Sequence, residues 1–119
     1  MKLMTAQMAK WRKVPEGYVF IDTTIKSGEP MLAPTWDMVA RHKAGTLTNE
    51  LYTEMYYKIM RDRYRQHHFW FNEFCGKEFV VISCYCKNGC FCHRYLLVDI
   101  IRKLCLSFGY PFEYLGEIT

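Results

Sequence analysis

The stretch Val80-Val-Ile-Ser-Cys-Tyr-Cys-Lys-Asn-Gly-Cys-Phe-Cys-His-Arg94 decides the fold of this chain. Its first part has the apolar, β-branched composition of a buried strand, and a short glycine loop follows. An amphipathic helix is predicted directly afterwards, from Cys92 to Phe108. Four cysteines, a histidine and an arginine therefore fall between the carboxyl end of a strand and the amino end of a helix. Open α/β proteins bind ligands at such junctions, so we expect the functional site there.

Residue patterns on either side predict further strands and helices. Tyr18-Val-Phe-Ile-Asp-Thr-Thr24 has the composition of a buried first strand that ends at Asp22. Thr35 and Thr48 are residues of the N-cap type and predict two helices, the first ending at Gly45. The other predicted elements are an aromatic helix from His68 to Phe74, a central strand from Glu78 to Cys84 or Cys86, and a short strand from Phe112 to Leu115.

This order of elements predicts an α/β fold with a small, largely parallel sheet flanked by helices. With 119 residues, 50% of them hydrophobic, we expect residues 1–119 to form a single domain around one core. The second helix should bury the face that carries Leu51, Met55 and Ile59. The aromatic side chains assigned to the core are Trp36, Tyr56, Trp70 and Phe71.

Composition and charge limit where the protein works and what it binds. The first 13 residues lack the apolar centre of a signal peptide, and no apolar stretch approaches the roughly 20 residues that span a bilayer. A cytoplasmic protein without a membrane segment is therefore predicted. A cytosolic chain keeps thiols reduced, so clustered cysteines indicate metal or thiolate chemistry, whereas Cys75 and Cys105 fit apolar helix faces. The net charge of +4 is compatible with an anionic ligand.

One interpretation of the cysteine cluster is a pocket that combines a thiol with an anion site. Cys92, His93 and Arg94 are predicted in the first turn of the last helix, where the helix dipole favours negative charge. A thiol there has a lowered pKa, which makes Cys92, or Cys90 just before it, a candidate nucleophile. Arg94 could bind a phosphate or carboxylate, and Asp22 could reach the same crevice if the two strands are neighbours.

A metal site is the alternative, with zinc as the cofactor. Zinc bonds thiolates at about 2.3 Å, which places the sulfurs roughly 3.8 Å apart. Cys84 and Cys86 would lie on one face of a strand with Cα atoms about 6.6 Å apart, so the strand would have to bend. A third interpretation is purely structural, with these cysteines packing in the core and the histidine capping the helix. The candidate metal ligands are Cys84, Cys86, Cys90, Cys92 and His93.

A nucleic-acid role rests on a separate stretch of the chain. Residues 58–70 mix basic and aromatic side chains, as nucleic-acid-binding proteins do. A helix with one charged face is, however, usually only solvated. This alternative would make Arg61, Arg63 and Arg65 the residues that contact nucleic acid.

The segment Val81-Ile-Ser-Cys-Tyr-Cys-Lys-Asn-Gly-Cys-Phe-Cys-His-Arg-Tyr-Leu-Leu97 resembles the C-terminal signature of domain-of-unknown-function family 488. In that signature an apolar strand runs into a cysteine, a short loop follows, and Cys-His-Arg opens a helix. The stretches Asp22-Thr-Thr-Ile-Lys-Ser-Gly28 and Leu32-Ala-Pro-Thr-Trp-Asp-Met-Val-Ala-Arg-His-Lys-Ala-Gly45 are similar to small variants of the family that are common in bacteriophage genomes. The resemblance spans roughly residues 18–108.

The resemblance implies a Rossmann-like α/β fold and does not imply a settled activity. Larger members follow the first-strand aspartate with a valine and an arginine, whereas Thr23 and Thr24 follow Asp22 here. Lys26 or the threonine hydroxyls could replace that arginine. Cys86 and Cys90 go beyond the minimal signature, which keeps the metal alternative open. The family's motif positions in this chain are Asp22, Cys84, Cys92, His93 and Arg94.

The leading functional hypothesis is a small phage-type protein with a pocket for a phosphorylated or nucleotide-like anion. Arg94 would bind the anion, aided by Lys26, Thr24 and Cys90 around it. His93 would transfer protons, Cys92 or Cys84 would supply a thiolate, and Asp22 would be their carboxylate partner. The residues fit an enzyme as well as a protein that binds without turnover. The second hypothesis is a zinc-stabilised protein that interacts with a host macromolecule.

Overall fold

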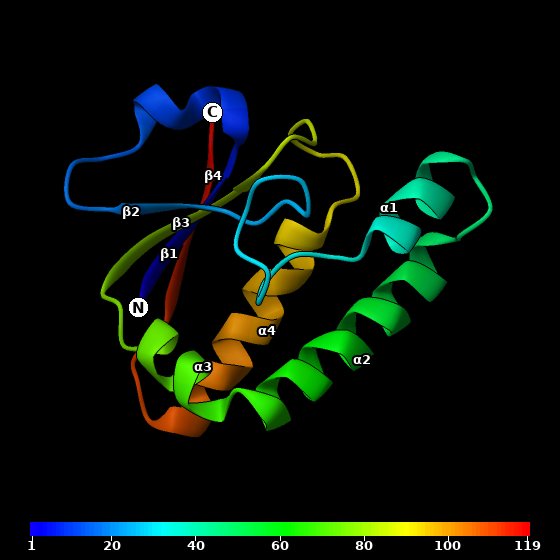
Figure 1. Cartoon of the computed structure of the whole chain (residues 1–119). Helices are drawn as coiled ribbons and strands as arrows, with labels where there is room; N and C mark the ends of the chain where they lie inside the picture. Colours follow the sequence, from blue (N-terminus) through cyan, green and yellow to red (C-terminus); the bar gives the residue numbers. More distant parts are fainter.

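A computed structural model describes residues 1–119 and contains a four-stranded, all-parallel sheet in the order β2-β3-β1-β4 (Figure 1). The strands are β1 (Lys2–Gln7), β2 (Val19–Asp22), β3 (Phe79–Cys84) and β4 (Glu113–Ile118). The helices are α1 (Trp36–Lys43), α2 (Asn49–Gln66), α3 (His68–Cys75), α4 (His93–Phe108) and the 3-10 helix η1 (Met8–Lys13). This architecture confirms the predicted small, Rossmann-like α/β fold.

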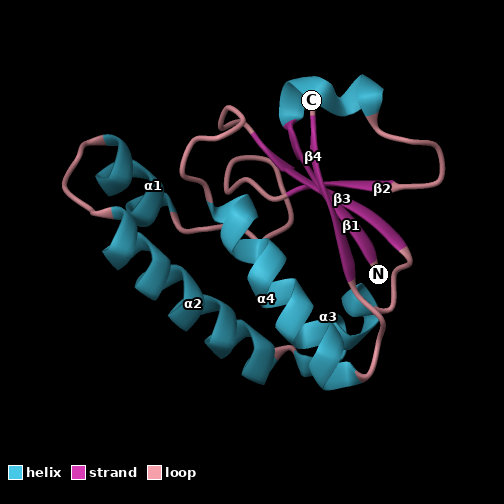
Figure 2. Cartoon of the chain, turned by 180° about the vertical axis from the view of Figure 1, so that it is seen from behind, coloured by secondary structure: helices cyan, strands magenta, loops and turns pink.

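The two faces of the sheet are covered unequally. Helices α2, α3 and α4 lie together on one side, as Figure 2 shows from behind, and α4 packs directly on β1 and β3. Side chains of β3 alternate between the faces because successive residues of a strand point in opposite directions. Val80 and Ile82 join the large core under the helices, while Val81 joins a smaller cluster with Ala6 and Ile118. The central strands are therefore buried on both faces.

The strand predicted at Tyr18 to Thr24 is the second strand of the chain, because β1 precedes it. β1 occupies an inner position between β3 and β4, and Leu3, Thr5 and Ala6 are fully buried there. A strand buried on both faces has no alternation of apolar and polar residues, so its sequence lacks the usual signal. The prediction of a central strand ending at Cys84 is confirmed.

The helix boundaries follow the predicted caps. The Thr35 hydroxyl accepts the Met38 N–H at 3.2 Å, and the Thr48 hydroxyl accepts the Leu51 N–H at 3.2 Å. These bonds satisfy amide groups that a helix leaves without partners at its amino end. Helix α4 ends at Gly109, whose φ of 82° suits a residue without a side chain. No helix of the structure is both long and apolar enough to cross a membrane.

Two expectations about the core need correction. Helix α2 buries Tyr52, Tyr56 and Met60. Of its predicted buried face, Met55 and Ile59 are partly buried against the core, whereas Leu51 is 48% exposed. The tyrosines supply more apolar surface than Leu51, and the Tyr56 hydroxyl donates to the Leu32 carbonyl at 2.6 Å, which satisfies its polar end. Trp36, at the start of α1, is 61% exposed and does not belong to the core. The predicted core positions Tyr56 and Phe71 are confirmed as buried; Trp70 is partly buried against the core, and Cys75 and Cys105 are buried within it.

The loop after β2 turns back on itself through Gly28. The Gly28 N–H donates to the Thr24 carbonyl at 2.9 Å, and the Glu29 N–H donates to the Asp22 carbonyl at 2.8 Å. A Cβ atom at position 28 would lie 2.6 Å from both Asp22 Oδ1 and the Thr24 nitrogen. Only a residue without a side chain allows this close approach.

We expect Gly28→Ala to lower the free energy of unfolding by about 2 kcal/mol, because the added methyl group must push the backbone after β2 apart. Urea unfolding followed by circular dichroism measures the change. Gly76→Ala is the matched control, since the nearest atom to a Cβ there is 3.4 Å away. Equal stability of the two variants would contradict the close packing of this loop.

Candidate functional site

Two buried thiols meet where β3 ends and α4 begins. Cys84 is the last residue of β3, and Cys92, predicted in the first turn of α4, is instead its N-cap residue, one position before the helix begins. Their Sγ atoms lie 2.7 Å apart. Since 2% of Cys84 and 4% of Cys92 is exposed, the pair is shielded from solvent. The junction predicted from the sequence therefore brings thiols together at the carboxyl edge of the sheet.

Arg94 is fully buried beside this pair, and protein groups occupy its donors. Nη1 donates to Cys84 Sγ and to the Cys86 carbonyl, each at 2.8 Å. Nη2 and Nε donate to the two carboxylate oxygens of Glu117 at 2.7 and 3.3 Å, and Nη2 also donates to the Tyr95 hydroxyl at 2.9 Å. Burial opposes the charge of Arg94, but Glu117 and Cys84 raise its pKa, so the guanidinium stays charged. Its positive charge faces the thiols.

Cys86 lies in the bend that follows β3 and lines the same cavity as Cys84 and Cys92. Hydrogen bonds from Cys84 and Cys92 lower the pKa of Cys86, and its partly exposed position keeps the cost of a charge small. The same hydrogen bonds, together with burial, raise the pKa of Cys92. The hydrogen bond to Cys86 raises the pKa of Cys84 despite the opposing effect of Arg94. These opposite pKa directions favour a thiolate on Cys86 over one on Cys84 or Cys92.

His93 is held in one tautomer by Thr23. Its Nε2 atom lies 2.9 Å from both the carbonyl oxygen and the hydroxyl of Thr23. The carbonyl can only accept, so Nε2 carries the hydrogen. Burial lowers the pKa of His93 to about 4, which leaves the ring neutral at pH 7. Nδ1 is then a free acceptor 3.7 Å from Cys92 Sγ and can take a proton or bind a metal ion.

A cavity of about 240 Å³ opens onto the thiol cluster. One wall is aromatic: the Phe91 ring lies 5.2 Å from His42 and 5.3 Å from Tyr52, measured between centroids. Trp36 lines the same cavity and exposes 61% of its surface. The polar lining consists of Thr24, Lys26, Lys43, Cys84, Cys86, Cys92 and His93. The cavity thus joins flat apolar surfaces, two cations and reactive thiols.

The structure separates the other predicted site residues. Thr24 and Lys26 line the cavity. The Asp22 carboxylate instead accepts hydrogen bonds from its own loop, from the Thr24 N–H at 2.8 Å and from the Ser27 hydroxyl at 2.5 Å. These bonds outweigh burial and lower the pKa of Asp22. Cys90 is exposed in the loop and lines neither the cavity nor the thiol cluster.

Sequence reasoning missed three features of the site. Glu117, the carboxylate partner of Arg94, lies 23 residues later on β4, beyond the predicted end of that strand. Thr23, which orients His93, was considered only as a substitute for an arginine. Phe91 and Trp36 form part of the cavity wall. A threonine directly after a strand is a weak signal, and nothing local in the sequence identifies the glutamate.

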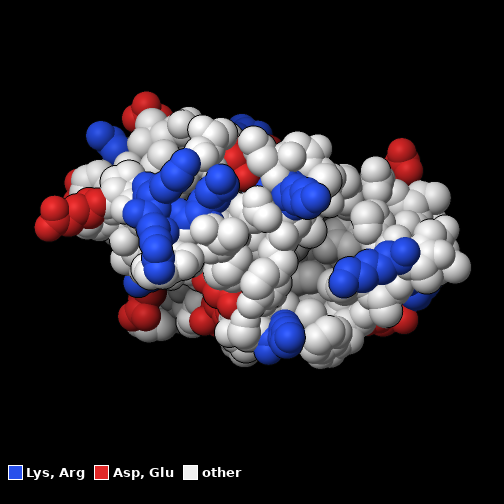
Figure 3. Space-filling model, turned by 90° about the horizontal axis from the view of Figure 1, so that it is seen from above, with Lys and Arg blue, Asp and Glu red and all other residues white.

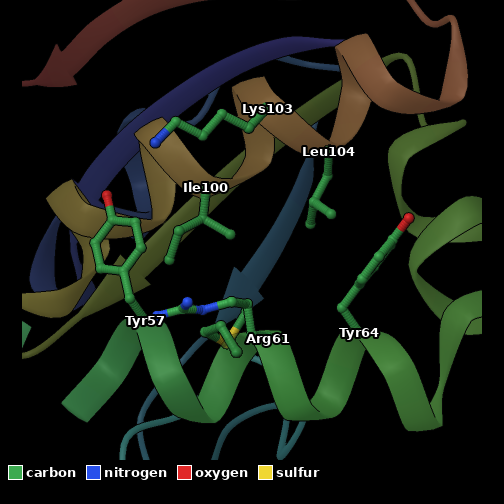
Figure 4. Close-up of a pocket in the computed structure, with 7 residues that line it drawn as sticks. Tyr57, Arg61, Tyr64, Ile100, Lys103 and Leu104 are labelled. Atoms are coloured by element: carbon green, nitrogen blue, oxygen red, sulfur yellow. The ribbon is translucent and has the colours of Figure 1, made fainter. Parts of the chain in front are cut away.

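Part of the basic and aromatic stretch 58–70 lines a hollow that is separate from the thiol cavity. Figure 4 shows this hollow between α2 and α4, with Ile100 and Leu104 projecting from α4 toward α2. Arg63 is turned inward, because its Nη1 donates to the Ala33 carbonyl at 2.6 Å and to the Met31 carbonyl at 3.2 Å. The Arg63 guanidinium therefore binds backbone carbonyls of the protein itself.

The buried, neutral His93 predicts a loss of stability in acid. Its ordinary pKa of 6.5 applies to the unfolded chain, which binds a proton before the folded protein does. The free energy of unfolding should therefore fall by about 3 kcal/mol from this residue as the pH drops from 7 to 4. Urea unfolding at several pH values measures the loss.

The variant His93→Gln should remove this part of the pH dependence, because an amide does not titrate. The matched control is His67→Gln, at an exposed histidine, and it should keep the wild-type slope. A constant offset between wild type and His93→Gln at every pH would contradict a neutral His93.

Comparisons with known proteins place this site in a family. A search of the curated proteins found no match, and neither did a search of solved structures. A family model described as the active DUF488-N3 subclade matches residues 4–104. This span includes most of β1, all of β2 and β3, and the thiol cluster with Arg94. The phage-type and cytoplasmic assignments stay predictions. Because the match extends well beyond the Cys-His-Arg segment, the chain belongs to the DUF488 family.

Proposed function

We propose that this protein is a thiol-dependent enzyme that acts on a nucleotide-like anion. The observation that carries the proposal is a group of three cysteines at one cavity, in which Cys84 binds the buried Arg94 and Cys86 is exposed with a lowered pKa. A reactive cysteine needs a stabilised thiolate and access to its substrate, and Cys86 has both. The description of the matching subclade as active agrees with catalysis.

The cluster can move one proton without losing its charge balance. The Cys86 thiolate bonds to an electrophilic centre of the ligand, and the leaving group departs with the bonding electrons and takes the Cys92 proton. The negative charge then lies on Cys92, whose Sγ is 3.7 Å from Arg94 Nη1. Water can release the product by the reverse movement, giving its proton to Cys92 while Cys86 leaves as a thiolate. While Cys92 is protonated, its thiol can donate to His93 Nδ1, which lies 3.7 Å away.

The ligand class follows from the cavity walls. Trp36, Phe91 and Tyr52 offer flat apolar surfaces that suit a planar base, and Lys26 and Lys43 suit a phosphate. Arg94 was predicted to bind the anion itself, but its donors already bind Cys84, Cys86, Tyr95 and Glu117. The lysines therefore bind the external anion in this proposal, and Arg94 stabilises the thiolate.

Alkylation by iodoacetamide, read by mass spectrometry, tests the thiolate. At pH 6.5 we expect Cys86 to react at least tenfold faster than Cys90, an exposed cysteine of the same loop and so its matched control. The rate at Cys86 should change little from pH 6.5 to 8.5, whereas an ordinary thiol reacts faster as the pH approaches about 8.5. Cys86→Ser should remove the fast reaction and Cys90→Ser should not. Equal rates at the two positions would overturn the thiolate.

Protection against the same reagent tests the ligand. A panel of nucleoside 5′-phosphates should include at least one that slows alkylation of Cys86, because an occupied cavity blocks the thiol. Lys26→Ala should weaken this protection about tenfold, and Lys77→Ala, at an exposed lysine before β3, should leave it unchanged. Absence of protection by every nucleotide would contradict the proposed ligand class.

Zinc binding is the second candidate, and one observation favours it. Donor atoms of Cys84, Cys92 and His93 lie within 4.8 Å of one another. The sequence-based objection to a straight strand concerned the pair of Cys84 and Cys86, and this donor group does not include Cys86. His93 Nδ1 is free to bind the ion, since Nε2 is engaged by Thr23. A structural zinc would support a protein that interacts with a host macromolecule.

Metal analysis of the protein purified without chelator separates the two candidates. One zinc per chain, with a melting temperature that falls by more than 10 °C on chelation, is the outcome expected for a structural metal. The thiolate proposal expects less than 0.1 zinc per chain and a melting temperature unchanged by chelator. Cys90→Ser serves as a control for either result, because Cys90 lies outside the donor group.

A further inference from the structure

A second hollow lies next to the thiol site, at the ends of β1 and β4. It measures about 340 Å³, and Ile118 is its one hydrophobic residue. Gln7, Lys10, Lys87 and Asn88 line it, together with Glu117 and Thr119. Glu117 belongs to both sites, because its carboxylate is bound to Arg94 behind the thiols. The Arg94–Glu117 pair therefore separates an aromatic cavity from a cationic one.

The carboxyl edge of the sheet carries many cations that no acidic side chain neutralises. Lys10, Arg12 and Lys13 lie in the last turn of η1, and Lys87 and Lys26 lie in the loops after β3 and β2. None of these residues forms an ion pair. Figure 3 looks onto this edge and shows lysine and arginine side chains across it, with a large group on the side where Figure 1 places η1.

Three acidic side chains are already engaged within the protein. Glu117 pairs with Arg94, Asp37 pairs with Arg41, and Asp22 accepts bonds from its own loop. Among the cations, Lys13 donates to the Thr119 oxygen at 2.9 Å, whereas Lys10, Lys26 and Lys87 make no such bond and can attract an anion. The overall charge of +4 thus understates the positive potential at the site.

Exposed aromatic rings accompany the cations. Trp11 in η1 is 56% exposed, and the Arg12 guanidinium lies over one side of its ring at 5.1 Å. Trp36 is 61% exposed beside the thiol cavity. Cations that follow a phosphate backbone, interleaved with rings on which bases stack, are typical of surfaces that bind single strands. An acidic protein partner or a membrane would not require these rings at both ends of the edge.

We propose that the substrate of the thiol site is a single-stranded nucleic acid, one nucleotide of which enters the aromatic cavity. Phosphates of the neighbouring nucleotides bind Lys87 and Lys10 in the second hollow, and a further base stacks near Trp11. A duplex cannot deliver a base into the cavity without unstacking it, so a single strand binds more readily. This inference rests on the proposed function and names the class of its substrate.

Fluorescence anisotropy with a labelled, mixed-sequence 12-nucleotide DNA and its RNA counterpart tests the proposal. We expect the better of the two to bind at least tenfold more tightly than any mononucleotide and to protect Cys86 from iodoacetamide. Affinity should fall steeply with salt, since each phosphate contact contributes about 0.7 to the slope of log K against log salt.

Charge reversal in η1 separates this inference from the proposed function. The double variant Lys10→Glu, Arg12→Glu should weaken oligonucleotide binding at least tenfold and flatten the salt dependence, while mononucleotide protection of Cys86 is unchanged. The matched control is Arg65→Glu on the exposed part of α2, which should bind as wild type does.

Each other outcome overturns the inference. Oligonucleotides that bind no better than mononucleotides, with Cys86 still reactive and protected, would refute the strand and leave the proposed function standing. Equal affinity for a duplex, strand binding without protection of Cys86, or preference for phosphatidylserine vesicles would also refute it. If the wild-type protein shows neither fast alkylation of Cys86 nor protection by mononucleotides, the proposed function itself has failed.

Discussion

The buried ion pair between Arg94 and Glu117 is the interaction on which the rest of the site depends. Arg94 has no exposed surface, and a guanidinium in that position is destabilising unless nearly all its donors have partners. The Glu117 carboxylate and Cys84 Sγ supply the charged partners, and the Cys86 carbonyl supplies a neutral one. One side chain thereby links the start of α4 with the ends of β3 and β4. Loss of either partner would leave an uncompensated charge in the interior.

The same arginine favours a thiolate nearby. A guanidinium whose carboxylate partner satisfies only one side still attracts a second anion on the other side. Cys84 Sγ and the Cys86 carbonyl accept hydrogen bonds on that side, and the lowered pKa of the exposed Cys86 favours the charge there. Arg94 therefore binds groups of the protein itself. The lysines around the aromatic cavity and the second hollow instead suit an external anion.

Parallel topology determines where these groups meet. All four strands end at one edge, so residues that follow β2 and β3 become neighbours of the amino end of α4. Thr23, directly after β2, reaches His93 at 2.9 Å although 70 residues separate them. The sequence predicted that Asp22 lies near the thiols if β2 and β3 are neighbours. The pairing is present, but the Asp22 carboxylate bonds to its own loop, and the neighbouring threonine makes the contact instead.

The sequence by itself determined the elements whose signals are local. Threonine caps, the glycine that ends α4, the apolar run of β3 and the Cys-His-Arg helix start depend on neighbouring residues, and so they were predicted correctly. Only the tertiary structure decided which of these residues meet. β1 carries no alternation because both its faces are covered, and Glu117 on β4 pairs with Arg94 at the start of α4, 23 residues earlier. Cys86 and Cys90 are equivalent in spacing and both exposed, yet only Cys86 lines the thiol cavity, because such neighbours depend on contacts that no local pattern encodes.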